Sequence, residues 1–163
     1  MSKKKIKEYI EELSKPREEF SGMPTCPYAH VHVNEGKMEI KEWDPNKTDI
    51  IDELVAFNDN EYKSTAWYLK DMSDIFKKGT VEETDKWTDE VNERLLEDYD
   101  FGFVMVTFNP NDNLEVEGFN PRSLSPYFII GVVYLEELNE AHDKLAESKY
   151  FDKLVGKYRD QLV

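Results

Sequence analysis

Two segments without any charged residue constrain the fold of this 163-residue chain more than any other feature. They are residues 101–108 (FGFVMVTF) and residues 127–135 (YFIIGVVYL), in a chain in which 34% of the residues are charged. Short apolar runs rich in β-branched and aromatic residues predict strands. Because neither run alternates with charged residues, both are predicted to be central strands that are buried on two faces.

Apolar residues at helical spacing predict helices between and around these strands. The first is expected at residues 3–15, where Ile6, Tyr9, Ile10 and Leu13 share one face. A second is predicted to start at Thr48 as its N-cap. A third starts at Thr80, which forms a capping box with Glu83, so that each side chain bonds a free backbone amide. Two more helices are predicted at the end of the chain, one with Leu135, Leu138, His142 and Leu145 on one face and one that starts at Ser148.

Shorter strands are predicted at residues 28–33, 37–43 and 64–69. Helices that alternate with strands favour parallel or mixed pairing, with the helices packed on the sheet. The expected fold is therefore α+β, a single layered domain over residues 1–163 with a mixed sheet of about four or five strands covered by helices. The helix within residues 1–20 is expected either to join this domain or to lie at its periphery.

The charge balance restricts the class of partner. The chain has 35 acidic and 21 basic residues, a formal net charge of −14, which argues against nucleic acids and anionic membranes. A basic protein partner is compatible with this charge, and so is a solvated surface that serves solubility. A single cysteine, no apolar run of about 18 residues and no signal peptide together predict a cytoplasmic protein that is not inserted in a membrane.

The segment TCPYAHVHV at residues 25–33 carries most of the reactive side chains. Cys26 is a candidate catalytic nucleophile if a neighbour lowers its thiol pKa, and His30 and His32 are the candidate neighbours. The alternative is a small buried cysteine. The two histidines share one face of the predicted strand, as ligands of zinc, iron or copper do, or else they are packed or solvated without a metal. The cofactor is therefore either a transition metal or none.

The polar connection between the two uncharged segments, residues 109–126 (NPNDNLEVEGFNPRSLSP), is longer than a simple hairpin requires. Its Arg122 offers a planar fork for a carboxylate or phosphate. Asn120, Ser123 and Ser125 flank it and could complete an anion-binding site. The alternative is a structural arginine that ties the loop to an acidic neighbour.

Three motifs resemble a family of small bacterial proteins of unknown function. They are TCPYA at residues 25–29, FNP at 108–110 and NPRSLSPY at 120–127. The family carries Cys-Pro-Phe-Ala, Phe-His-Pro and Asn-Arg-Ser-Pro-Tyr-Pro in the same order, and the likeness covers roughly residues 22–145. The resemblance implies that the site residues are Cys26, Pro27, Asn109, Pro110, Asn120, Arg122, Ser123 and Pro126.

This chain departs from the family pattern in two places. Asn109 stands where the family has histidine, and Pro121 and the pair Leu124-Ser125 interrupt the last motif. If that histidine is a base or a ligand in the family, its role here is lost or has moved to His30 or His32. The resemblance implies candidate residues and no reaction.

Two functions stay open from the sequence. The first is a small-molecule, carboxylate-binding protein or enzyme with a site of cysteine, histidine and arginine. The second is an acidic interaction protein that binds a basic protein without catalysis. Glycine-rich phosphate loops, the nucleophile-elbow motif of serine hydrolases and zinc-finger spacings do not occur in the chain. Whether the protein is an enzyme is therefore undecided.

Overall fold

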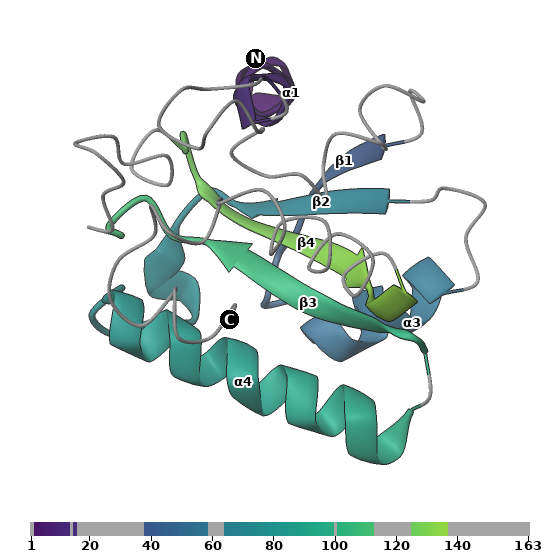
Figure 1. Cartoon of the computed structure of the whole chain (residues 1–163). Helices are drawn as coiled ribbons and strands as arrows, with labels where there is room; N and C mark the ends of the chain where they lie inside the picture. The colour runs from purple at the N-terminus through teal and green to yellow at the C-terminus, as the bar shows by residue number, and fades with distance from the viewer. Residues whose placement is uncertain are drawn as a thin grey trace, which may run out of the picture.

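The chain folds as an α+β protein, as predicted, with helices on both faces of a mixed sheet (Figure 1). The computed structural model describes residues 2–13, 15, 38–58, 64–99, 101–112 and 125–136. The elements are α1 (Ser2–Leu13), β1 (Met38–Glu42), α3 (Ile50–Asn58), β2 (Ser64–Leu69), the 3-10 turn η2 (Met72–Asp74), α4 (Val81–Asp98), β3 (Phe103–Phe108) and β4 (Phe128–Tyr134).

The described sheet has four strands in the order β1-β2-β4-β3. β1 and β2 are parallel, while β4 is antiparallel to both of its neighbours, β2 and β3. The prediction of two central strands is right for β4, which lies between two strands. It is wrong for β3, which forms one edge of the described sheet. The side chains of β3 accordingly alternate between buried and half-buried instead of being buried on both faces.

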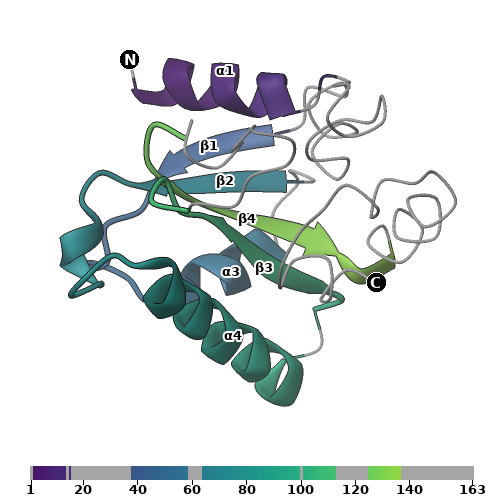
Figure 2. The same cartoon turned by 60° about the vertical axis from the view of Figure 1, so that its left-hand side comes forward.

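Each face of the sheet has its own apolar cluster. On one face, α3 and α4 pack on residues such as Trp67, Met105 and Ile130. On the other face, α1 packs on Ala66, Tyr68 and Ile129. Figure 2 shows α1 on one side of the sheet and α3 and α4 on the opposite side. Alternate residues of β2 and β4 therefore serve different layers, as the period of two in a strand requires.

The α1 helix forms because its apolar residues repeat every three or four positions. The predicted residues Ile6, Tyr9, Ile10 and Leu13 are all buried. The Tyr9 ring meets Phe108 of β3 edge to face, with the ring centroids 6.5 Å apart. α1 is thus a packed layer of the fold and not a peripheral helix.

α4 contacts β3 through a stripe of polar side chains spaced four residues apart. Thr88 Oγ1 lies 3.0 Å from Thr107 Oγ1, and the Asn92 side chain bonds the backbone of Met105. Thr84 Oγ1 accepts a hydrogen bond from Asn109, just after β3 ends. Residues at this spacing share one face of a helix, so the stripe follows the length of the strand.

The N-terminus of α4 is capped as the sequence predicts. Thr80 Oγ1 accepts a hydrogen bond from the backbone N–H of Glu83 at 3.2 Å. The Glu83 carboxylate accepts from the backbone N–H groups of Lys77, Lys78 and Gly79. The Glu83 carboxylate therefore bonds the three residues before Thr80 and not Thr80 itself. These bonds hold the turn at residues 77–79 against the start of α4.

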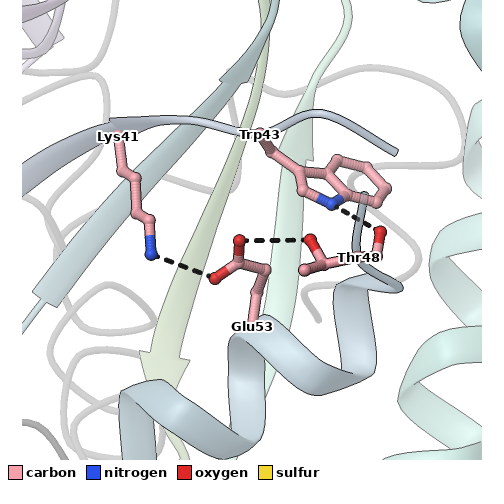
Figure 3. Close-up of polar contacts among 4 residues, drawn as sticks. All are labelled: Lys41, Trp43, Thr48 and Glu53. Carbon is pink, nitrogen blue, oxygen red and sulfur yellow. Dashed lines mark hydrogen bonds and ion pairs between the residues drawn. The ribbon is translucent and has the colours of Figure 1, made fainter. Parts of the chain in front are cut away.

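The predicted cap of α3 is wrong by one residue. Asp49, not Thr48, accepts the free backbone amide, with its Oδ1 2.8 Å from the N of Ile51. Thr48 is engaged elsewhere. Its hydroxyl donates to Glu53, whose carboxylate also pairs with Lys41 at 3.2 Å (Figure 3). Its carbonyl accepts from the Trp43 indole at 3.1 Å, so the loop from β1 to α3 is held by side chains.

Several predicted elements lie outside the described residues. They are the strand at residues 28–33, the turn that follows it and the helices after Glu136. In the described ranges no helix is both long and apolar enough to cross a membrane.

Candidate functional site

Most of the site residues predicted from the sequence lie outside the part of the chain that the structure describes. They are Cys26, His30, His32, Asn120, Arg122 and Ser123. Among the described residues, no group of three or more His, Cys, Asp or Glu side chains could hold a metal ion. The thiol and metal predictions therefore stay predictions. Of the predicted site residues, the structure describes Asn109, Pro110 and Pro126, which lie at the two ends of the predicted loop.

Asn109 is buried and fully engaged by its neighbours. Its Nδ2 donates to the carbonyl of Gly79 and to Thr84 Oγ1, both at 3.1 Å, and its Oδ1 accepts from the backbone N of Asn111 at 2.8 Å. Because both amide hydrogens are used, a ligand would have to replace one of these bonds. In this structure, Asn109 ties the end of β3 to the start of α4.

Both ends of the loop are anchored at one place. Phe108, the last residue of β3, is paired with Ile129 of β4, so residues 109 and 126 lie just beyond the adjacent ends of neighbouring strands. Ser125 is buried and its hydroxyl donates to the carbonyl of Tyr127 at 2.6 Å. The loop is thus a long connection between antiparallel neighbours, and rigid buried side chains hold its two ends.

This anchor lies at the carboxyl ends of three strands. Leu69 at the end of β2 pairs with Phe128, and β1 runs parallel to β2 and ends beside Tyr68. β1, β2 and β3 therefore end on the same side of the sheet, where the N-terminus of α1 also lies (Figure 2). In open α/β sheets, ligands bind outside the carboxyl ends of the strands.

A cluster of hydroxyl groups lies at this edge, on the α1 face of the sheet. The rings of Tyr68 and Tyr127 have centroids 5.5 Å apart, and the Tyr127 hydroxyl lies 3.0 Å from Ser2 Oγ at the first residue of α1. Tyr68 is only 5% exposed. Its hydroxyl makes no hydrogen bond with any residue that the structure describes.

Two charged side chains complete the cluster. Lys70 Nζ lies 3.2 Å from Glu42 Oε1, and both side chains are partly open to solvent. Burial, and then the charge of Glu42, raise the pKa of Tyr68. The hydrogen bond to Glu42, and then its charge, raise the pKa of Lys70. Tyr68 is therefore a neutral donor, and Lys70 a cation, at physiological pH.

The sequence analysis did not single out Tyr68, Lys70 or Tyr127. Tyr68 and Lys70 stand two residues apart at the end of a predicted strand, which places them on one face. This two-residue spacing is the sequence feature that could have indicated a shared site for Tyr68 and Lys70. The contact with Tyr127 depends on the pairing of β2 with β4, which are far apart in sequence, and no local pattern predicts it.

A scan against protein-family models, a search of the curated proteins and a search of the solved structures found no match for this chain. The resemblance to the bacterial family with Cys-Pro-Phe-Ala and Phe-His-Pro motifs therefore stays a prediction.

Proposed function

We propose that the protein binds a small molecule that carries a carboxylate, at the edge of the sheet where β1, β2 and β3 end. The observation that supports this function is the anchoring of the loop at residues 109–126. Asn109 and Ser125 are buried and hold its two ends beside the carboxyl ends of the strands. Loops on such a rigid base commonly carry binding residues.

Each predicted site residue has a role in this proposal. Arg122, within the loop, supplies a bidentate fork for the carboxylate. Asn120 and Ser123 add hydrogen bonds. If the ligand is also a substrate, Cys26 acts as the nucleophile, and His30 or His32 lowers its pKa. Binding is the core of the proposal, and catalysis is an extension that the Cys26 variant tests.

A thermal-shift panel of small carboxylates tests the function. We expect at least one carboxylate to raise the melting temperature of the wild-type protein, and Arg122→Ala to abolish that increase. Arg94→Ala is the matched control, because Arg94 is exposed on α4, a helix on the opposite face from α1. The proposal fails if no carboxylate stabilises the wild type, or if Arg122→Ala and Arg94→Ala respond equally. For an active ligand, Cys26→Ser should bind it without converting it.

A second function, binding of a basic protein, is favoured by the outer face of α4. Several exposed carboxylates of this helix form no ion pair with any described residue, namely Glu82, Asp89, Glu90, Glu93, Glu97 and Asp98. Leu96 lies among them and is 65% exposed, the only large hydrophobic residue so exposed in the described ranges. An apolar anchor surrounded by charges of one sign fits a partner with an apolar pocket and a basic rim.

Titration with a basic protein at low salt tests the second function, with lysozyme as the probe. We expect lysozyme to bind, and we expect the substitutions Glu93→Gln, Glu97→Gln and Leu96→Ala to weaken this binding. The binding should disappear in about 0.5 M salt, where the Debye length is only a few ångströms. Glu39→Gln on β1 is the control on another element. If Leu96→Ala leaves the affinity unchanged, the interaction is non-specific and α4 is not a docking surface.

A further inference from the structure

The two edges of the described sheet differ in how their backbone groups are satisfied. At the β3 edge, the side chain of Asn92 bonds both the N–H and the carbonyl of Met105. At the β1 edge (Figure 1), the outward-facing backbone groups make no hydrogen bond with any residue that the structure describes. An edge strand with such groups is a template for pairing with another strand.

The backbone direction of β1 determines which of its residues can bond a further strand. The N–H of Trp43, just after β1, donates to the carbonyl of Tyr68 on β2 at 3.0 Å. Backbone groups alternate in direction along a strand, so every second residue counted back from Trp43 faces β2. The residues that face outward are therefore Met38, Ile40 and Glu42. These three positions are symmetric about Ile40.

We infer that β1 pairs with β1 of a second copy of this chain, antiparallel and about a two-fold axis at Ile40. A two-fold contact uses the same surface on both copies, so the strand must be complementary to itself. In the register centred on Ile40, every outward-facing residue lies opposite an outward-facing residue, and each N–H finds a carbonyl. The two sheets then form one continuous sheet.

The charged side chains of β1 are complementary to themselves in this register. Glu39 lies opposite Lys41 of the second copy, and the symmetry repeats the pair, with Cβ atoms about 4.5–5.5 Å apart. A shift by two residues places Lys41 opposite Lys41 or Glu39 opposite Glu39. A shift by one residue opposes outward-facing groups with inward-facing groups. Charge and backbone direction therefore select the same register.

The side chains that this contact requires are accessible. The Lys41 side chain is 49% exposed, and Glu53 at 3.2 Å is its ion-pair partner among the described residues (Figure 3). The Glu39 carboxylate forms no ion pair with any described residue. Ile40 is half-buried at the edge of the α1 layer. Pairing gives Glu39 a cation, lets the Lys41 ammonium bridge two carboxylates, and brings the two Ile40 side chains together.

Charge-reversal variants test the contact, with molar mass measured by light scattering over a range of protein concentrations. A strand pairing of this length buries little surface, so we expect a monomer–dimer equilibrium in the wild type. Glu39→Lys and Lys41→Glu each place like charges opposite one another. Each should raise the dissociation constant of the dimer by about tenfold or more. Mixed in equal amounts, the two variants should form a heterodimer, because every facing pair is then of opposite charge.

Glu93→Lys, an equal change of charge on the exposed side of α4, is the matched control and should dimerise like the wild type. Glu39→Lys makes the net charge less negative, so general repulsion alone would favour association, the opposite of the expected result. This variant also keeps the Lys41–Glu53 ion pair, so it stays decisive if Lys41→Glu fails to fold.

Three results would overturn the inference. The first is a wild type that is monomeric at every concentration. The second is a dimer that Glu39→Lys leaves as tight as in the wild type. The third is a mixture of the two folded variants that stays monomeric, because the substitutions would then act within one chain and not across a two-fold contact.

Discussion

The side chain of Asn92 on α4 bonds the backbone of Met105 on β3 in both directions. Its Nδ2 donates to the Met105 carbonyl at 2.9 Å, and its Oδ1 accepts from the Met105 N–H at 2.7 Å. β3 is at an edge of the described sheet, where backbone groups lack a neighbouring strand. A helix side chain thus takes the place of that strand and blocks pairing with another molecule.

Loss of the Asn92 amide should destabilise the protein. We expect Asn92→Ala to lower the free energy of unfolding by about 1–3 kcal/mol, because two backbone groups of Met105 lose their partner. Urea unfolding measures this change. Glu93→Ala, the next residue and exposed, should change stability by less than about 0.5 kcal/mol. Equal effects of the two substitutions would show that the amide has no special role.

The edge of β3 gives a second readout for the same variant. Because the backbone groups of Met105 lose their partner, the Asn92→Ala protein should self-associate at concentrations where the oligomeric state of the wild type does not change. Size-exclusion chromatography at several protein concentrations detects the difference. The expectation is refuted if both proteins elute identically at every concentration.

Asn109 should act together with Thr84. The Asn109 amide donates to Thr84 Oγ1 at 3.1 Å, and both residues are buried. In a double-mutant cycle, Asn109→Ala and Thr84→Val should each cost about 1–3 kcal/mol, and the double variant less than their sum. Additive losses would mean that the bond contributes nothing. Asn109→His, which restores the residue of the resembling family, should also destabilise, because imidazole cannot donate to Gly79 and Thr84 as the amide does.

Two glycines have left-handed backbone conformations that alanine disfavours. Gly79 has φ +65° and Gly102 has φ +70°. An added Cβ at Gly79 would lie at ordinary contact distance from Met72 and Asn111, and at Gly102 it would meet nothing within 4 Å. Gly79→Ala and Gly102→Ala should therefore destabilise by a similar amount, about 1–2 kcal/mol, set by the backbone alone. A much larger loss at Gly79 would reveal a packing constraint on that turn.

Acid should weaken the turn before α4. The hydrogen bond from the backbone N–H of Lys78 is the main cause that lowers the pKa of Glu83, with those from Gly79 and Lys77 adding to it. A carboxylate whose pKa is lower in the folded state binds a proton more readily when unfolded. Its contribution to stability is therefore complete above the ordinary glutamate pKa and is lost as the pH falls through the folded value.

Melting curves of the wild type and Glu83→Gln measure this effect. We expect the wild type to melt at the higher temperature near pH 7, and the difference to shrink as the pH is lowered through the acid range. Asp52→Asn, on an exposed carboxylate of α3, is the control for the general effect of charge. A difference that is constant with pH would contradict the role assigned to the Glu83 carboxylate.

The local part of the fold could be predicted from the sequence because short-range patterns determine it. The face of α1 follows from the spacing of Ile6, Tyr9, Ile10 and Leu13, and the cap of α4 by Thr80 follows from its position three residues before Glu83. The position of β3 at an edge of the described sheet could not be predicted. Its uncharged sequence resembles that of a central strand because α4 covers one face and Asn92 satisfies Met105.

The candidate site was less predictable than the fold. Asn109 was singled out because it stands where the resembling family has histidine, whereas its hydrogen bonds are made with Gly79 and Thr84, which are distant in sequence. Tyr68 and Tyr127 meet because β4 pairs with β2, a pairing that no spacing along the chain encodes. A polar cluster that forms through the pairing of distant strands can be predicted only when the strand order is known.

The central position of β4 also has a consequence for how the protein folds during synthesis. Among the described strands, β4 is the last to leave the ribosome, yet it alone joins the β1-β2 pair to β3. Until residues 128–134 emerge, those two parts of the sheet share no backbone hydrogen bonds. Folding therefore waits for contacts that are distant in sequence, which slows it and leaves two strand edges open on the nascent chain. A chaperone that covers such edges would matter most just before β4 appears.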